Sequence, residues 1–183
     1  ATLRETGLDK NTVIVFASDH GDLDAAHGFE HKSLSYEESA RVPFIVSWPG
    51  HTPAGKVDRK HLVSSCIDLF PTLCDYAGIT PPPGLPGRSV RGIVERGSQP
   101  GWRDDVAIEC SDSRCVRTAR YKYTLYEGPG RRELLTDMQK DPGEMVNLVG
   151  NPRYRAVLED HRKRLRRNVE ELNDAYGRSL LTS

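Results

Sequence analysis

The sequence has no excess of charge of either sign and no long hydrophobic run. Its 183 residues include 26 Lys plus Arg and 26 Asp plus Glu, so the formal net charge is zero. A balanced charge argues against a general electrostatic grip on nucleic acid or on an anionic membrane. The longest apolar runs, residues 13–17 and 42–46, are far shorter than the roughly 20 residues of a membrane-spanning helix. We therefore expect no nucleic-acid partner and no membrane span.

The chain also lacks a Met start, a signal-peptide pattern and any Cys-x-x-Cys pair. We expect it to begin inside a larger protein and to use neither the common zinc motif nor the common redox motif. Cys66 and Cys74 fall on one face of a predicted helix and are interpreted as buried thiols. Cys110 and Cys115 either close a small loop, which would indicate an oxidising compartment such as the periplasm or the cell exterior, or stay free.

Two short apolar segments predict strands in the first half of the chain. Residues 13–17 (Val-Ile-Val-Phe-Ala) are typical of a strand buried on both faces of a mostly parallel sheet. Residues 42–48 predict a second strand, with Pro43 near its start. Residues 3–8 predict the tail of a helix that ends near Gly7. The charged segment between the strands, residues 18–41, is long for a connection in a compact domain and is therefore expected to be functional.

A helix and a connector follow the second strand. Residues 60–77 place apolar side chains at helical spacing, and Gly78 closes the helix, with Pro71 predicted to break it or to start a second helix. Residues 81–101 are rich in Pro, Gly and Ser and predict an irregular connector over the surface. We place the main boundary there, which divides the chain into residues 1–101 and residues 102–183.

Four short runs beyond the connector predict a small antiparallel sheet. They are residues 106–109, 115–119, 121–126 and 133–135, separated by turn residues such as 128–130. Asn151 then offers a helix N-cap with Pro152 at the first helical position, and apolar residues recur at three and four up to a stop at Gly177. This pattern predicts one long amphipathic helix. Its basic residues 162–167 are interpreted as a solvated face that rests on acidic neighbours.

The first candidate site follows the first predicted strand, as Ser18-Asp19-His20-Gly21. In open α/β sheets ligands bind at the carboxyl ends of strands. Asp19 supplies a hard anionic oxygen, His20 an imidazole, and Gly21 lets the backbone turn closely. Because calcium takes about six to eight oxygen ligands, the two residues are at most half of a metal site. A plain turn cap after a strand explains the same tripeptide, so both interpretations stand on these residues alone.

Further segments along the chain share the order and spacing of one known family. They are His27-Gly28, Lys32 and residues 36–39, 41–44, 48–50, 64–73, 87–89, 117–123, 133–137 and 141–148. These segments are spread along most of the chain, so the resemblance extends over nearly its whole length. The sequence resembles the C-terminal portion of the sulfatase family, in the alkaline-phosphatase superfamily. The resemblance implies an α/β fold class: the C-terminal part of an alkaline-phosphatase-like mixed sheet flanked by helices, then a small antiparallel sheet with one long helix.

The resemblance also implies roles for individual residues. Asp19 and His20 would be ligands of a divalent metal, calcium foremost and magnesium or manganese otherwise. Lys32 would contact the sulfate and stabilise or protonate the leaving oxygen, because a cation near the ester offsets the charge that develops there. His27 and His31 flank the site and either contact substrate and orient ligands or pack structurally. Tyr36, Glu37, Glu38 and Arg41 are interpreted as scaffold that includes a buried Arg–Glu pair.

Two parts of the family's active site are absent from this chain. Sulfatases use a formylglycine nucleophile, made from the first residue of a Cys/Ser-x-Pro-x-Arg motif, and an acidic pair near the start of the domain. Residues 110–114 (Cys-Ser-Asp-Ser-Arg) imitate the motif, but Asp112 stands in place of Pro and the segment follows the Asp-His pair instead of preceding it. We interpret it as a decoy. The nucleophile is expected upstream, and the chain by itself is expected to be inactive.

The expected function is the hydrolysis of sulfate esters by the parent enzyme. Its expected partners are a sulfate-ester substrate, the missing N-terminal part of the same enzyme and, through apolar surface, a second copy of the chain. Two alternatives remain. A phosphodiesterase or phosphonate monoester hydrolase of the same superfamily could share Asp19, His20 and the fold, and a non-catalytic interaction module could keep the fold alone.

Overall fold

The computed structural model of the protein describes residues 2–129 and 132–182, so Gly130 of the predicted turn at 128–130 lies outside the described residues. The chain forms two compact units, each described below by itself. Unit 1 comprises the residues up to Asp19 together with Val42–Arg103, and unit 2 comprises His20–Arg41 together with the residues from Asp104 onward. Residues 20–41 thus group with the C-terminal part of the chain. A division into domains at residue 101 stays a prediction.

Unit 1 contains a pair of short strands. β1 (Ile14–Ala17) pairs with β2 (Phe44–Ser47) in antiparallel register, with Phe16 opposite Ile45. The prediction that this first strand is buried on both faces among parallel neighbours is therefore wrong for the described part of the chain. Because side chains alternate along a strand, Ile14, Phe16 and Ile45 share one face of the pair, and all three are exposed. Ahead of the strands, α1 (Thr2–Glu5) ends before Gly7, whose φ of 72° is left-handed, as predicted.

The helix predicted from residue 60 begins later and continues past its proline. α3 spans Ser65–Ala77, contains Pro71 and ends at Gly78 in the left-handed conformation. Pro71 deprives the carbonyl of Ile67 of its helical partner, and the backbone of Gly87 packs against that carbonyl so closely that a Cβ at Gly87 would lie 1.7 Å from it. The expected break at Pro71 is therefore wrong, because a tertiary contact accommodates the exposed carbonyl.

The connector of unit 1 contains a short helix that its composition did not predict. α4 (Arg91–Arg96) lies within the segment expected to be irregular and ends at Gly97. It is held by buried contacts: Ile93 is buried, and the amide of buried Val90 donates to the Thr72 hydroxyl at 3.0 Å. One helical turn of apolar spacing is too short to be recognised among prolines and glycines.

A buried carboxylate organises the rest of unit 1. Asp68, which is completely buried in the first turn of α3, accepts two hydrogen bonds from the Arg103 guanidinium at 2.6 and 2.7 Å. It also accepts from the backbone amides of Ser64 at 2.8 Å and Arg88 at 2.9 Å. One side chain thus ties the helix start to two points of the connector.

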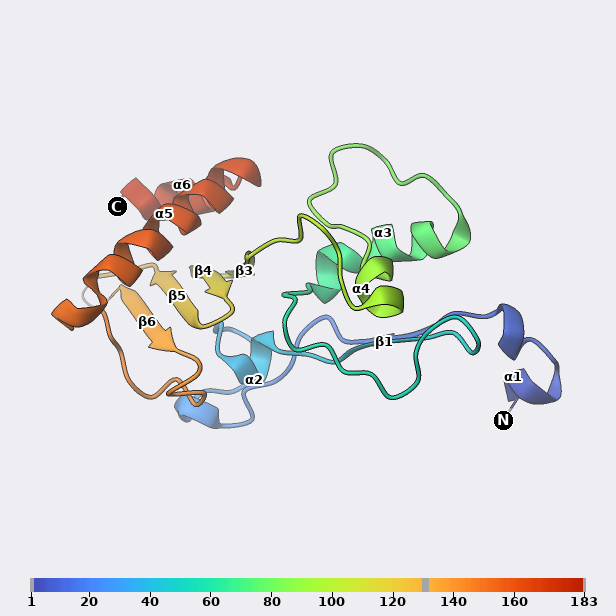
Figure 1. Ribbon diagram of the computed structural model, residues 1–183. Coiled ribbons are helices and arrows are strands. Elements are labelled where there is room, and N and C mark those ends of the chain that lie inside the picture. The colour runs from blue at the N-terminus through green and yellow to red at the C-terminus, as the bar shows by residue number, and fades with distance from the viewer. Residues whose placement is uncertain (1, 130–131, 183) are drawn as a thin grey trace. The chain divides into compact units, whose positions relative to one another are not determined.

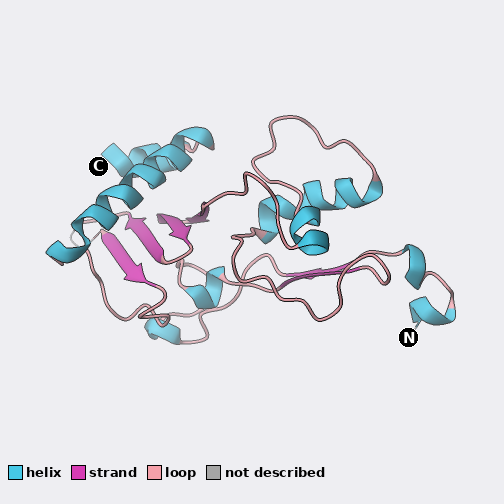
Figure 2. Ribbon diagram, in the orientation of Figure 1, coloured by secondary structure: helices cyan, strands magenta, loops and turns pink. Residues whose placement is uncertain are grey.

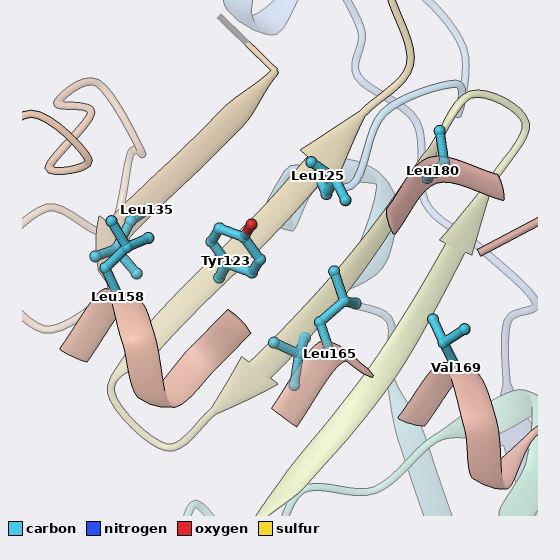
Figure 3. Packing of buried hydrophobic residues seen from close by; sticks show 8 residues of the cluster. Tyr123, Leu125, Leu135, Leu158, Leu165, Val169 and Leu180 are labelled. Atoms are coloured by element: carbon cyan, nitrogen blue, oxygen red, sulfur yellow. The ribbon is translucent and has the colours of Figure 1, made fainter. Parts of the chain in front are cut away.

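The second half of the chain forms the antiparallel sheet that the sequence predicted. Its strands are β3 (Asp105–Cys110), β4 (Ser113–Thr118), β5 (Tyr121–Tyr126) and β6 (Glu133–Asp137), in that spatial order, as Figure 2 shows in magenta. Helices α5 (Arg155–Glu171) and α6 (Ala175–Thr182) run beside this sheet (Figure 1). Their apolar side chains pack on it in one cluster around Leu135, Leu158 and Leu165 (Figure 3).

The C-terminal helix differs from the prediction at its end. A short 3₁₀ turn (Pro152–Tyr154) precedes α5, and the Asn151 side chain accepts from the amide of Arg153 at 3.1 Å, as expected of an N-cap. The expected single helix to Gly177 is wrong: α5 stops at Glu171, and α6 follows a turn at Asn173, whose φ is 53°. Asp174 stabilises this turn, because it accepts from the Gly177 amide and pairs with Arg114.

Charged and sulfur-containing side chains of the sequence also have clear places. The basic run of α5 rests on acidic neighbours, as predicted: Arg162 pairs with Glu133, and Arg164 pairs with Asp105.

All four cysteines are free, so Cys110 and Cys115 form no disulfide. Cys74 is buried as expected, whereas the same expectation is wrong for Cys66, which is exposed. No helix among residues 2–129 and 132–182 is long and apolar enough to cross a bilayer.

Candidate functional site

The segment predicted to hold the site follows β1 directly. Asp19 is the last residue of unit 1 and His20 the first of unit 2. The hydroxyl of Ser18 lies 3.4 Å from the Asp19 carboxylate, and the thiol of Cys66 donates to the Asp19 carbonyl at 3.5 Å. The carboxylate and the imidazole are therefore carried by consecutive residues at the end of a strand, as the sequence predicted.

Lys32 and His20 come together in the structure. The Lys32 ammonium lies 2.7 Å from Nε2 of His20, and Nδ1 of the same ring lies 2.7 Å from the carbonyl oxygen of Gly21. Because a carbonyl only accepts and an ammonium only donates, Nδ1 carries the proton and Nε2 carries the lone pair. A ring nitrogen fixed by a carbonyl in this way leaves the other nitrogen ready to bind a cation.

Gly21 is required for a different reason from the one expected. Its amide donates to the carbonyl of Ser39 at 2.7 Å, and a Cβ at this position would lie 2.0 Å from the carbonyl oxygen of Glu38. The glycine thus allows the close approach of α2 (Glu37–Ala40), which fixes the backbone beside His20.

The loop between His20 and α2 is strained and well anchored. Four of the six described non-glycine residues with positive φ fall within it: Asp24, Ala25, His27 and His31. Leu23 is buried, and its amide donates to the carbonyl of His31 at 2.7 Å. Strained residues persist only where their surroundings hold them, and they cluster at functional sites.

The two remaining histidines have different surroundings. The ring of His27 stacks on Tyr36 with centroids 3.7 Å apart, and its Nε2 lies 3.7 Å from the Glu38 carboxylate. These contacts favour the packing role that was one of its two interpretations. His31 contributes its backbone carbonyl to Leu23, and its side chain is exposed.

Glu37, interpreted as part of the scaffold, pairs with a lysine that the sequence analysis did not predict. Glu37 lies 3.5 Å from Arg117 and 3.2 Å from Lys122, and Lys122 lies 2.9 Å from Glu144. Burial by itself raises the pKa of Glu37, but Lys122 and Arg117 hold that pKa below its usual value. In the sequence, the position of Lys122 between two tyrosines of a predicted strand was the available signal that this lysine has a buried acidic partner.

The predicted decoy at residues 110–114 has a structural role in unit 2. Arg114 donates to the Cys110 carbonyl at 2.7 Å and pairs with Asp174. Burial raises the pKa of the Cys110 thiol, which keeps it protonated and poorly nucleophilic. Both observations support its interpretation as a decoy.

The described residues do not form a complete metal site. No group of three or more His, Cys, Asp or Glu side chains among residues 2–129 and 132–182 could hold a metal ion. The donor chemistry of Asp19 and His20 nevertheless fits a divalent cation, because the pair combines a carboxylate with an imidazole whose tautomer leaves the lone pair on Nε2.

An antiparallel sheet beside two helices, preceded by an Asp-His pair and a strained lysine loop, defines the C-terminal part of a sulfatase. The family model described as N-sulphoglucosamine sulphohydrolase, C-terminal, matches residues 25–171, and the chain belongs to this family. The Δ4,5-hexuronate-2-O-sulfatase of Bacteroides thetaiotaomicron is 40% identical over 95% of the chain. The chain spans only 38% of that relative's length.

Solved structures agree with this assignment. A 2-O GAG sulfatase superposes with a TM-score of 0.85 at 37% identity, over 95% of this chain and 39% of its own. The phosphonate monoester hydrolase of Agrobacterium radiobacter has a TM-score of 0.79 at 29% identity, over 92% of this chain and 37% of its own. The predicted family and fold class are thereby confirmed, and the sulfatases among the relatives are sulfuric ester hydrolases.

Proposed function

We propose that the enzyme to which this chain belongs hydrolyses sulfate esters, and that the chain supplies Lys32 as a catalytic residue together with Asp19 and His20. The observation that carries the proposal is the 2.7 Å contact between the Lys32 ammonium and Nε2 of His20. It places a cation at the ring nitrogen that carries the lone pair. A cation such as the Lys32 ammonium recognises a sulfate group, and a ring that binds a metal cation next to it contributes to the activation of that group.

Asp19 and His20 are the residues that would hold a divalent metal, with calcium as our first choice and magnesium or manganese as alternatives. Such an ion supplies positive charge that polarises the sulfate. The Gly21 carbonyl holds His20 in the tautomer that a metal ligand requires, because it accepts the Nδ1 proton. Asp19 contributes the hard oxygen that these ions prefer.

Lys32 would donate to the sulfate and stabilise the leaving oxygen. As an ammonium it offers three protons, so it could leave the His20 nitrogen and contact substrate without a change in its own charge. Charge develops on the bridging oxygen when the S–O bond breaks, and a cation held in place there lowers the barrier. His31 is proposed to flank the substrate, and His27 is proposed to pack beside it on Tyr36. The formylglycine nucleophile is proposed to come from the N-terminal part of the enzyme.

A phosphonate monoester hydrolase is the second candidate, because such an enzyme shares the fold over nearly the whole chain. The sulfate ester is favoured by the higher identity to the hexuronate sulfatase, which is 40% against 29% for the phosphonate monoester hydrolase. A carbohydrate 2-O-sulfate on an unsaturated hexuronate is therefore our first substrate choice.

The test is a substrate panel with the complete enzyme. Release of sulfate from a 2-O-sulfated unsaturated hexuronate disaccharide is compared with cleavage of a phenyl phosphonate and a phosphodiester, each with calcium and with chelator. We expect sulfate release to exceed the other two reactions and to need the metal. The metal content of Asp19→Ala is expected to fall, whereas Asp9→Ala, which removes a half-buried carboxylate on a different turn, keeps it. Preferred cleavage of the phosphonate would replace the sulfatase proposal with the second candidate.

A further inference from the structure

Strand β5 uses its two faces for two different purposes. Tyr123 and Leu125 point to the helices and belong to the apolar cluster (Figure 3). The alternate residues, Lys122 and Thr124, contact the segment that carries the site instead. Lys122 lies 3.2 Å from the Glu37 carboxylate, and the Thr124 hydroxyl lies 3.0 Å from that of Ser35. The sheet is thus covered on one face by helices and on the other by residues of the loop 20–41.

Glu144 completes the contact at the start of α2. Its Oε2 lies 2.9 Å from the Lys122 ammonium and accepts the backbone amide of Glu37 at 2.8 Å. The side chains of Lys122 and Glu144 are only 2% and 1% exposed. A buried carboxylate that receives a helix amide and an ammonium fixes the helix start in position and orientation.

The chain accepts two energetic costs at this residue. Glu144 has a φ of 54°, which is unfavourable for a side chain with a Cβ, and its Oε1 is buried without a hydrogen-bond partner among the described residues. Replacing a buried ion pair by apolar groups is often neutral or stabilising, so stability alone does not explain this arrangement. Its cost is consistent with a role in holding the loop.

Short hydrogen bonds connect this contact to the backbone near the Lys32–His20 pair. Ser39 of α2 accepts from the amide of Gly21, the residue after His20. The bond from the amide of buried Leu23 to the carbonyl of His31, the residue before Lys32, lies within the loop and does not involve α2. The side chain of Ser39 also donates to the carbonyl of Leu34. A shift of α2 would therefore move the backbone on which the pair depends.

We propose that Lys122 and Glu144 are positioning residues for the sulfate-ester centre: by holding the start of α2 against β5, they set the backbone that brings Lys32 to His20. This inference rests on the proposed function for its catalytic consequence but not for its structural one. It assigns the small C-terminal sheet a part in catalysis, through the loop that it holds.

The structural consequence is tested by hydrogen–deuterium exchange with mass spectrometry on the complete enzyme. Glu144→Gln keeps the shape of the side chain and removes its charge. We expect amides of residues 20–41 to exchange roughly tenfold faster, with little change in residues 155–171. Arg114→Met is the matched control, because Arg114 forms a buried ion pair with Asp174 on the helix-facing side of the same sheet. This control is expected to affect the helical region and to leave residues 20–41 unchanged.

The catalytic consequence is tested by steady-state kinetics with the same variants. We expect Glu144→Gln to lower kcat by about ten- to a hundredfold with KM changed less than threefold, because small displacements of a catalytic group cost rate more than binding. Arg114→Met should keep kcat within about twofold, as a substitution away from the loop. Thr124→Val, which removes only the partner of Ser35, should show a smaller effect of the same kind and decides the matter if Glu144→Gln does not fold.

The possible outcomes separate the two proposals. Unchanged exchange in residues 20–41 of Glu144→Gln overturns the positioning role. Equal effects of Glu144→Gln and Arg114→Met on exchange and on kcat also overturn it, since the pair would then serve general stability only. A wild-type enzyme without sulfatase activity refutes the proposed function, while the exchange experiment still decides whether Lys122 and Glu144 hold the loop.

Discussion

Each of the two units of the chain is stabilised internally by a different kind of interaction. Unit 1 depends on a polar centre, where Asp68 collects four hydrogen bonds from the guanidinium and backbone around it. Unit 2 has an apolar cluster on one face of its sheet and a buried ion pair on the other. The loop with Lys32 and His20 belongs to unit 2, so the strained part of the molecule is joined to the part with the larger apolar core.

This contrast explains where the chain can store strain. A two-stranded ribbon such as β1–β2 is marginal by itself, and its exposed face adds little stability in this chain. A four-stranded sheet covered on both faces can hold several unfavourable backbone conformations. The left-handed non-glycine residues of the loop and Glu144 belong to unit 2, and no such residue lies among the described residues of unit 1.

The largest expected effect on stability comes from a substitution that removes the polar centre of unit 1. Asp68→Ala leaves the Arg103 guanidinium partly buried without its carboxylate, so we expect a loss of about 3–5 kcal/mol in the free energy of unfolding. The measurement is hydrogen exchange at the amides of α3. Asp75→Ala on the same helix is the control, because Asp75 is 42% exposed and its pair with Arg91 should be worth about 1 kcal/mol or less. Equal losses in the two variants would contradict a single organising carboxylate.

A somewhat smaller effect is expected from the apolar cluster of unit 2. Leu135→Ala removes a completely buried side chain and should cost about 3 kcal/mol, through lost burial and the cavity left behind. The free energy is measured by hydrogen exchange at the amides of β5. Phe16→Ala removes a side chain that is 60% exposed on β1 and should cost less than about 1 kcal/mol in the same experiment on β1. A larger loss at Phe16 than at Leu135 would reverse the comparison.

The smallest effect concerns pH. Burial lowers the pKa of His161, although the nearby Asp160 raises it. The ring lies 3.1 Å from the Thr118 hydroxyl and 2.8 Å from the Val157 carbonyl. Because the unfolded chain then binds more protons, stability is complete above about pH 6.5 and is lost as the pH falls towards the folded pKa. Thermal melts between pH 5 and 7.5 measure this loss.

The variant His161→Gln should flatten that pH dependence by removing the titrating group. His51→Gln is its control, since His51 is an exposed residue of unit 1 stacked on Trp48. A pH profile that is the same in wild type and His161→Gln would show that burial of this ring does not link its protonation to folding.

Local patterns were enough for the strands of unit 2 but not for the long-range partners of their side chains. The strands were predicted within two residues, because alternating apolar residues and turn residues mark them. The pairing of Lys122 with Glu37 and Glu144 joins segments far apart in sequence, and no local pattern contains it. The end of α5 was missed for a similar reason, since Asp174 is set by its pair with Arg114 from β4.

The site residues Asp19, His20 and Lys32 stay a prediction from the sequence, and the contacts that the structure shows around them were not predictable. The position of Asp19 and His20 after a strand and the family-like spacing of Lys32 predicted these residues. The tautomer of His20 depends on the Gly21 carbonyl, and the reason for Gly21 lies in the backbone of Glu38, neither of which a sequence pattern shows. The faces of β1 were mispredicted because an unbroken apolar run gives no information about which neighbours are present.

The most direct test of the account is the turnover of a sulfate ester by the complete enzyme with Lys32→Ala, beside Lys56→Ala as a control on an exposed loop of unit 1. We predict that Lys32→Ala lowers kcat by roughly 10² to 10³, because a cation is lost where charge develops, and that Lys56→Ala stays within about twofold of wild type. A kcat for Lys32→Ala equal to that of the control would contradict the assignment of Lys32 to the sulfate-ester centre.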